Sequence, residues 1–225
     1  DPSVGRGIYS LLSALVSPRP IAWVSTTSVD GVDNLAPHSF FQLISTAPPI
    51  LMIATLGEKD TAKNIRETGE FVVCGSPTRL IREINRTAVE FTADVDEFDA
   101  VGLTREPSER VAPPRVLESP FALECRCVSI QDVGNAIMLL GEVVLIAVDP
   151  AVMEDNRVRV DLIDPIARLS GSQWSTIGEI VDLLIREFRL RLFRRFCCRI
   201  HDIEDRAHVQ RTTVGRLVEQ SGDEL

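Results

Sequence analysis

Short apolar runs separated by turn residues dominate the first quarter of the chain. Three of these runs are rich in β-branched residues, and they cover Ile21–Thr27, Leu35–Ser45 and Ile50–Leu56. Asp30-Gly31 and Pro48-Pro49 separate them, and glycine and proline at such places mark turns between strands. The pattern predicts a meander of three antiparallel strands.

A helix is predicted directly after the third run. The tripeptide Lys59-Asp60-Thr61 precedes the segment AKNIRETG, which ends at Gly69. Backbone N–H groups at a helix start lack intrahelical partners and attract an anion, and a lysine beside them adds positive charge. Thr26 and Ser39 add hydroxyl groups from the strands. The stretch therefore predicts a site where main chain holds a planar ligand and the helix start holds its phosphate.

The middle of the chain continues with strands and helices. Glu70–Gly75 indicates a strand, and Pro77 opens the helical segment TRLIREINRTA. Ala122–Gln131 and Ala136–Val148 are joined by the turn sequence DVGN, so they predict a hairpin, and its second strand is expected to bend at Gly141. Together with the meander and the helical segments, this hairpin predicts a mainly β fold with peripheral helices (α+β).

Three further segments are less regular. Ile8–Val16 is compatible with a short helix or a strand, Asp94–Gly102 with a short helix that has an acidic first turn, and Arg157–Val160 with an edge strand. Acidic residues at a helix start interact favourably with the helix dipole. We interpret the acidic cluster as a solvated helix face rather than a metal site.

The overall charge argues against nucleic acid as a partner. The formal net charge is −9 and only 5% of the residues are aromatic, whereas nucleic-acid surfaces need basic patches and stacking side chains. No apolar run reaches the roughly 20 residues that cross a bilayer, and no signal-peptide pattern opens the chain. We therefore expect a cytoplasmic protein without a membrane span.

Cysteine and histidine usage indicates neither a disulfide framework nor a metal centre. The five cysteines include no C-x-x-C pair, and the three histidines, His38, His201 and His208, are scattered. An odd number of cysteines with this spacing suits buried or free thiols in a reducing compartment. We expect the cysteines to fill space and no residue to bind a metal.

Several pieces of the chain, in order, resemble the flavin reductase-like family. They are PRPIAWVST, DGVDNLAPHSFF, the Pro-Pro doublet, KDTAKNI, GEFVV and ARLSGSQW, and together they span roughly residues 8–180. One such piece is a weak signal, whereas several in the family's order are specific. The resemblance implies an FMN-binding split β-barrel, a homodimer with the flavin near the subunit interface, and, as in many members, NAD(P)H as the electron donor.

If FMN is bound, particular residues are expected to contact it. The candidate cofactor-binding residues are Arg19, Thr26, Ala36, Pro37, His38, Ser39, Lys59, Thr61, Asn64 and Trp174. Ala36 to Ser39 would meet the flavin ring or ribityl chain, and Thr26, Lys59, Thr61 and Asn64 would meet the phosphate. The flavin itself carries out the redox chemistry, so no catalytic acid or base is predicted.

Two candidate residues have alternative roles. Arg19 either reaches the ligand phosphate or pairs with a carboxylate. Trp174 either covers the isoalloxazine, in its own or the partner subunit, or anchors the core or the dimer interface. The sequence leaves both choices open.

Three hypotheses of function follow. The first is an NAD(P)H-dependent FMN reductase that supplies reduced flavin to an oxygenase or reduces another acceptor. The second is an FMN-binding or electron-transfer protein without turnover, and the third is a structural β-barrel dimer. The pair Lys59 and Thr61 beside a helix start favours flavin binding over the third hypothesis. It does not separate the first two.

The end of the chain departs from the family. We assign residues 1–180 to the split-barrel domain and residues 181–225 to an Arg-rich helical extension with an apolar stripe. Covering the barrel or the partner subunit is the favoured role for this extension. Binding to a membrane surface and a poorly ordered tail are the alternatives.

Overall fold

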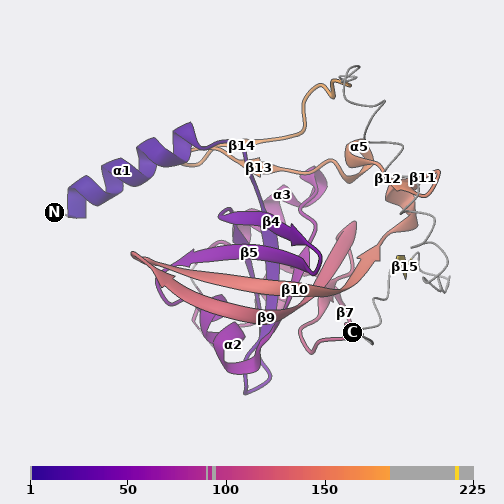
Figure 1. Ribbon diagram of the computed structural model, residues 1–225, viewed down its shortest axis with the longest axis horizontal. Helices are drawn as coiled ribbons and strands as arrows, with labels where there is room; N and C mark the ends of the chain where they lie inside the picture. The colour runs from indigo at the N-terminus through magenta and orange to yellow at the C-terminus, as the bar shows by residue number, and fades with distance from the viewer. Residues whose placement is uncertain (1, 90, 93–94, 183–215, 218–225) are drawn as a thin grey trace.

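An open antiparallel sheet of eight strands organises the fold (Figure 1). The computed structural model describes residues 2–89, 91–92, 95–182 and 216–217. The strand order is β3, β2, β6, β9, β10, β5 and β4, and β15 pairs with β10. The strands are β2 (Ala22–Thr27), β3 (Asp33–His38), β4 (Phe41–Thr46), β5 (Pro49–Leu56), β6 (Glu70–Cys74), β9 (Phe121–Val133), β10 (Ala136–Val148) and β15 (Arg216–Leu217). This arrangement confirms the mainly β fold with peripheral helices.

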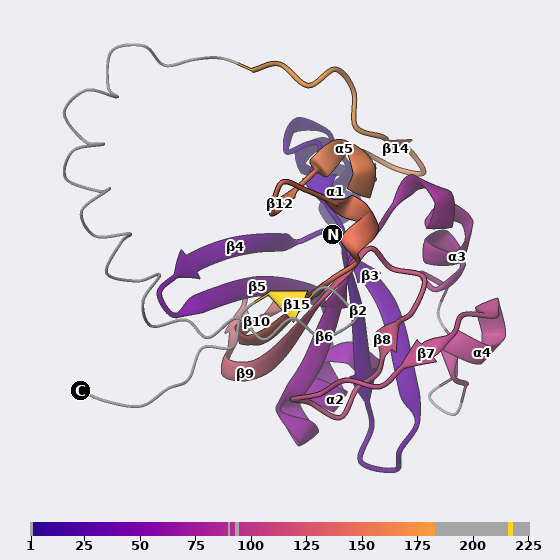
Figure 2. The ribbon, with the colours of Figure 1, turned by 90° about the vertical axis from the view of Figure 1, so that its right-hand side faces the viewer.

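Helices and short strands surround the sheet. The helices are α1 (Pro2–Leu15), α2 (Asp60–Thr68), α3 (Ile81–Arg86), α4 (Glu97–Val101) and α5 (Val160–Ile163), with 3-10 turns η1 (Thr78–Leu80) and η2 (Pro150–Val152). The short strands are β1 (Arg19–Pro20), β7 (Arg105–Glu106), β8 (Arg115–Val116), β11 (Met153–Glu154), β12 (Arg157–Val158), β13 (Ala167–Arg168) and β14 (Trp174–Ser175). Figure 1 shows α1 projecting from the body of the molecule, and Figure 2 shows α4 beside β7.

β2 is buried because its side chains belong to two hydrophobic clusters. Trp23 packs in the same cluster as Phe98 of α4, whereas Val24 packs in the same cluster as Ile65 of α2. Successive strand residues point to opposite faces, so one apolar run serves both clusters. The indole N–H of Trp23 donates to Thr87 Oγ1 at 2.9 Å, which satisfies the polar atom of the buried ring. β2 therefore contributes side chains to the cluster that contains α2 residues and to the cluster that contains α4 residues.

The long hairpin of β9 and β10 confirms the prediction from the second half of the chain. Its pairing runs from Val133 opposite Ala136 to Phe121 opposite Val148. The register shifts beside Gly141, where an added Cβ would lie 2.2 Å from Cζ of the buried Phe71 ring. Glycine is therefore required at the predicted bend, because the ring occupies the space of any side chain.

The predicted strand Leu35–Ser45 is wrong as a single element. β3 ends at His38 and β4 begins at Phe41. β3 pairs with β2 and β4 pairs with β5, so the two strands lie at opposite ends of the strand order. Ser39 and Phe40 separate them, and this pair contains no glycine, asparagine or proline that would indicate a break.

The less regular segments have mixed outcomes. Ile8–Val16 proves largely helical, as the second half of α1. Of Arg157–Val160, only β12 is a strand; it pairs with β11 outside the main sheet, and Val160 begins α5. Residues 183–215 and 218–225, which hold most of the expected extension, lie outside the described residues. No helix in the described part of the chain is long and apolar enough to cross a membrane.

Three cysteines fall in the described segments, and all are free thiols. Cys74 and Cys125 are buried and Cys127 is half-buried. Burial raises the pKa of Cys74 to about 12, so its thiol stays protonated. These three agree with the space-filling role predicted for them, whereas Cys197 and Cys198 lie outside the described residues.

Candidate functional site

Of the two cavities described below, the larger lies between the end of β3 and the start of α2. Its volume is about 510 Å³, within the range of about 300–1,000 Å³ that is usual for small-molecule sites. Phe40, Ala54 and Leu56 contribute apolar side chains to its lining, and Tyr9 joins them from α1. Six predicted residues line the same cavity, namely Ala36, Pro37, His38, Ser39, Lys59 and Thr61.

The start of α2 provides the cationic and hydroxyl side of the cavity. Lys59 directly precedes the helix in extended conformation (φ −111°, ψ 166°), and Thr61 in the first turn is only 1% exposed. The helix ends as predicted at Gly69, whose φ of 75° is left-handed and whose N–H donates to the Ile65 carbonyl at 2.9 Å. A nine-residue helix therefore begins at the cavity, where its first N–H groups lack helical partners.

A chain of hydrogen bonds joins β3, β2 and α2 behind the cavity surface. His38 Nε2 lies 3.1 Å from Thr61 Oγ1, and Asn34 Nδ2 donates to the hydroxyl oxygens of Thr61 and Thr26 at 3.2 Å each. Asn64 Nδ2 donates to Thr26 Oγ1 at 3.1 Å. All five side chains are buried, so the loss of one partner leaves another polar group unsatisfied. The network fixes the position of α2 relative to β3.

His38 is a neutral member of this network. Its side chain is 8% exposed, and burial, followed by the positive charge of Lys59, lowers its pKa from 6.5 to about 4. A neutral imidazole has one N–H donor and one acceptor nitrogen. At neutral pH His38 therefore acts as a hydrogen-bonding group, and the positive charge of this region comes from Lys59.

Thr26 and Asn64, which were predicted to meet a phosphate, do not line the larger cavity. Thr26 is fully buried, and Asn64 is 4% exposed and lines the smaller cavity. Both are connected to Thr61 through Asn34. The structure thus places them in the layer that supports the cavity wall.

Arg19 also lies outside the lining of both cavities. Its guanidinium donates to the carbonyl oxygens of Val16 at 2.7 Å and Leu169 at 2.6 Å, and also to that of Ser13. Its Nε donates weakly to Ser39 Oγ at 3.4 Å. Arg19 therefore holds the end of α1 and the segment after β13 together, next to one cavity residue.

Trp174 is part of β14 and is half-buried. Its ring packs against the hydrophobic cluster that contains Trp23, and the guanidinium carbon of Arg168 lies 4.5 Å from the ring centroid. Neither cavity includes it among its lining residues. Within the single chain, Trp174 occupies a core-anchoring position.

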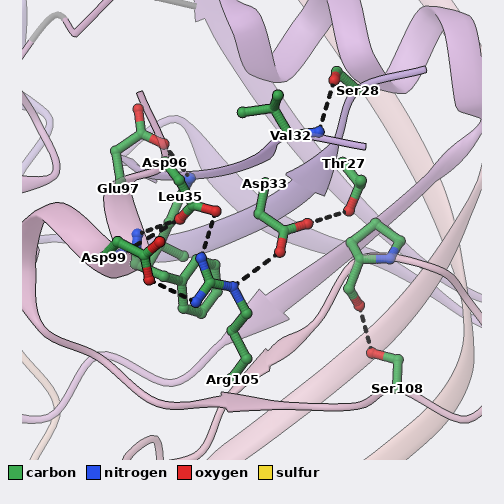
Figure 3. A network of polar contacts seen from close by, with 12 residues as sticks. Thr27, Ser28, Val32, Asp33, Leu35, Asp96, Glu97, Asp99, Arg105 and Ser108 are labelled. Atoms are coloured by element: carbon green, nitrogen blue, oxygen red, sulfur yellow. Dashed lines mark hydrogen bonds and ion pairs between the residues drawn. The ribbon is translucent and has the colours of Figure 1, made fainter. Parts of the chain in front are cut away.

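The acidic segment Asp94–Gly102 contains a wall residue that the sequence did not predict. Glu97, expected on a solvated face, is 6% exposed and lines both cavities. Its Oε2 accepts the Leu35 N–H at 3.0 Å (Figure 3). Burial raises the pKa of Glu97, the Leu35 hydrogen bond opposes this shift, and the charges of Asp60 and Asp96 add to it.

Arg105 attaches α4 to β3 through the other acids of this segment. Its guanidinium donates to Asp33 at 3.1 Å, to Asp99 at 2.8 Å and to Asp96, and it lies 5.1 Å from the Phe98 ring centroid (Figure 3). Asp96 also caps the helix by accepting the Phe98 N–H at 2.9 Å. The predicted favourable placement of acidic residues at the helix start is confirmed. The predicted solvated face is wrong for Asp96, which pairs with Arg105, and for Glu97, which is buried.

A smaller cavity of about 280 Å³ adjoins the first. The two share Asn34, Asp60 and Glu97 as lining residues. The other charged residues of the smaller cavity are Asp30, Asp33 and Lys63. Its walls therefore carry more negative than positive groups.

Asn34 and Glu97 are the main site residues that sequence reasoning missed. Asn34 lies inside the motif DGVDNLAPHSFF and pairs directly with Thr26 in the β2–β3 register, so the predicted hairpin contained the signal for it. Glu97 reaches the site only through the docking of α4 on β3. No local pattern could reveal that contact.

Comparison with known proteins assigns the chain to a family. A model described as the flavin reductase like domain matches residues 15–162. An uncharacterized protein of Aquifex aeolicus (strain VF5) is 38% identical over 176 residues, which cover 76% of this chain and 90% of that protein. The uncharacterized protein YwrF of Bacillus subtilis (strain 168) is 35% identical over 196 residues, which cover 82% of this chain and 96% of that protein.

Solved structures agree with this assignment. The 2-nitrobenzoate 2-nitroreductase NbaA of Pseudomonas fluorescens is 33% identical with a TM-score of 0.76, and the match covers 81% of this chain and 92% of that chain. Nitrilotriacetate monooxygenase component B of Bacillus cereus is 30% identical with a TM-score of 0.76, covering 79% of this chain and 93% of that chain. The chain therefore belongs to the flavin reductase-like family of flavin-binding oxidoreductases, and its open sheet is the split barrel of that family.

Proposed function

We propose that the protein is an NAD(P)H-dependent flavin reductase that binds FMN in the larger cavity and transfers a hydride from the nicotinamide to the flavin. One observation carries this proposal. A single cavity is lined by Ala36 to Ser39 from the end of β3 and by Lys59 and Thr61 from the start of α2. Main-chain groups suit the edge of a planar ring, and a cation beside a helix start suits a phosphate.

The chain's own residues have binding and orienting roles in this proposal. Lys59 and Thr61 would hold the phosphate, and Ala36 to Ser39 would hold the ring against the apolar side chains of Ala54 and Leu56. Neutral His38 would keep Thr61 in place without adding a charge. Bound FMN would supply the redox chemistry. The protein would then determine which face of the ring the nicotinamide can reach.

The same proposal includes a homodimer with the flavin near its interface, and a cytoplasmic location. Ile8, Leu11, Leu12 and Leu15 of α1 are each between 51% and 72% exposed. Tyr9 of the same helix lines the larger cavity. A second copy that covers these apolar side chains would also close the cavity on that side. Light scattering on wild type and on Leu12→Glu/Leu15→Glu tests this part, and a monomeric wild type would contradict it.

The acceptor of the electrons is proposed from relatives. One similar structure is a component of nitrilotriacetate monooxygenase, and another is a nitroreductase. These two similarities support the proposal that the protein passes reduced flavin to an oxygenase or reduces another acceptor directly. The fold alone does not choose between them.

An absorbance experiment tests the central proposal. FMN is added to the purified protein under anaerobic conditions, followed by NADH or NADPH. We expect a perturbed flavin band that bleaches faster with protein than without it, and the faster nucleotide identifies the donor. A perturbed band that neither nucleotide bleaches would instead support the FMN-binding or electron-transfer protein, and an unperturbed band would contradict flavin binding.

A further inference from the structure

Glu97 is the buried carboxyl group of the wall that the two cavities share. It is 6% exposed, and its Oε2 accepts the Leu35 N–H at 3.0 Å. Figure 3 shows the other carboxyl oxygen directed away from this hydrogen bond. A carboxyl group in such a place lies beside any ligand that fills the larger cavity.

Acidic groups outnumber basic groups around Glu97. Besides Glu97, the charged and titratable residues that line the two cavities are Tyr9, Asp30, Asp33, His38, Glu58, Lys59, Asp60 and Lys63. Asp96 precedes Glu97 in its own segment. Arg105 pairs with Asp33, Asp96 and Asp99, so its single positive charge offsets only part of their negative charge. Neutral His38 adds no charge. Asp60 lines both cavities, as Glu97 does, and its negative charge raises the pKa of Glu97 together with that of Asp96.

A phosphate-bearing ligand adds two negative charges to this environment. At pH above about 6 a phosphate monoester is mainly a dianion. Lys59 and the start of α2 favour the phosphate, but an ionised Glu97 in the wall of the same cavity repels it. The burial and the acidic neighbours that already favour the protonated form of Glu97 make protonation the low-cost way to remove this repulsion.

We propose that Glu97 takes up a proton from solvent when a phosphate-bearing ligand fills the larger cavity, and that the neutral carboxyl group then donates a hydrogen bond to the ligand. The inference rests on the proposed binding of FMN and adds a residue that distinguishes phosphorylated from neutral flavins. The proton moves from water to a carboxylate oxygen, and no bond of the ligand changes. Linkage requires FMN binding to tighten as the pH falls.

Calorimetry of the full chain tests the proposal. FMN and riboflavin are titrated at pH 7.5 in two buffers with different enthalpies of ionisation, and the difference in heat gives the protons taken up. We expect uptake with FMN, little with riboflavin, and loss of the FMN uptake in Glu97→Gln. Between pH 7 and 8.5 the wild-type Kd for FMN should rise by up to about tenfold per pH unit, the limit for one proton.

Matched variants make the result specific to Glu97. Glu58→Gln removes a carboxylate from the same cavity, but Glu58 is exposed and pairs with Arg66 at 3.3 Å, so this variant should keep the proton uptake. Equal uptake in wild type and Glu97→Gln would overturn the proposal. If Glu97→Gln does not fold, Asp60→Asn decides, because removal of that charge should reduce the uptake, and an unchanged value would overturn the proposal.

The failure of this inference is distinguishable from failure of the proposed function. Binding of FMN without proton uptake would overturn only the role of Glu97. Absence of binding by both FMN and riboflavin would overturn flavin binding in the cavity, and the inference with it.

Discussion

Nε2 of His38 lies 3.1 Å from the hydroxyl oxygen of Thr61, and this contact joins the last residue of β3 to the first turn of α2. The two residues also line the same cavity. A change at either one therefore acts on ligand binding and on the docking of the helix. The predictions below separate these two effects.

The phosphate role of α2 predicts a selective loss of affinity. Lys59→Ala together with Thr61→Val should weaken FMN binding, because charge-assisted hydrogen bonds contribute about 1.5–3 kcal/mol each. The affinity for riboflavin, which has no phosphate, should fall much less. Fluorescence titration with both flavins measures the difference, and an equal loss for both would show that the variant disturbs the cavity as a whole.

The low pKa of His38 predicts a pH-dependent stability. The unfolded state takes up a proton below about pH 6.5, whereas folded His38 does so only near pH 4, so the unfolded state binds more protons between these values. The free energy of unfolding should therefore fall as the pH falls through this window, by up to about 3 kcal/mol.

Urea unfolding at pH 7.5, 6 and 5 measures this effect. His38→Gln keeps one donor and one acceptor but cannot titrate. As the pH falls, the free energy of unfolding of the wild type should decrease relative to that of the variant. Parallel curves for the two proteins would contradict the lowered pKa.

Replacing Arg105 should destabilise the protein more than the loss of an ordinary surface ion pair does. Its side chain is 33% exposed, and its guanidinium joins Asp33 of β3 to two acids of the α4 segment. Arg105→Gln should lower the free energy of unfolding by about 1–2 kcal/mol, after allowance for solvent screening.

Arg159 offers a matched control for this prediction. It also pairs with two carboxylates, those of Glu154 and Asp161, but it is 41% exposed and these contacts stay within one local segment. Arg159→Gln should lower the free energy of unfolding by less than Arg105→Gln does. Equal losses in the two variants would show that the contact of α4 with β3 is not specially stabilised.

A methyl group added at Gly141 should not be tolerated in β10. Its Cβ would lie 2.2 Å from Phe71 Cζ and 3.3 Å from Cys125 Cβ. Gly141→Ala should destabilise the protein by about 1–3 kcal/mol, the usual effect of overpacking. Gly7→Ala, in α1 with nothing within 4 Å, should be neutral or stabilising. Thermal unfolding of both variants checks the contrast.

Local patterns predicted the parts of the fold that depend on local chemistry. Gly69 ends α2, and the turn before Ala136 forms the long hairpin, because each signal lies within a few residues of the structure that it specifies. The break at Ser39 and Phe40 was not predictable in this way. It arises because β3 pairs with β2 and β4 pairs with β5, and partners distant in the chain determine where each strand ends.

The candidate site was predictable to a similar extent. Ala36 to Ser39, Lys59 and Thr61 were predicted from one stretch of sequence, and the structure brings them to one cavity. Glu97 enters that cavity from a helix that Arg105 attaches to β3. An acidic residue near a helix start ordinarily faces solvent, so only the tertiary contact reveals its burial.

The break between β3 and β4 also links ligand occupancy to the resistance of the whole molecule to heat. Ser39 and Phe40 connect the two edge strands of the open sheet and line the cavity. A ligand held there contacts the chain where it passes from one edge to the other, so it favours the folded sheet as a unit. At a ligand concentration 100 times the Kd, this coupling amounts to about 2.7 kcal/mol. The melting temperature of the protein therefore reports how much of the cavity is filled.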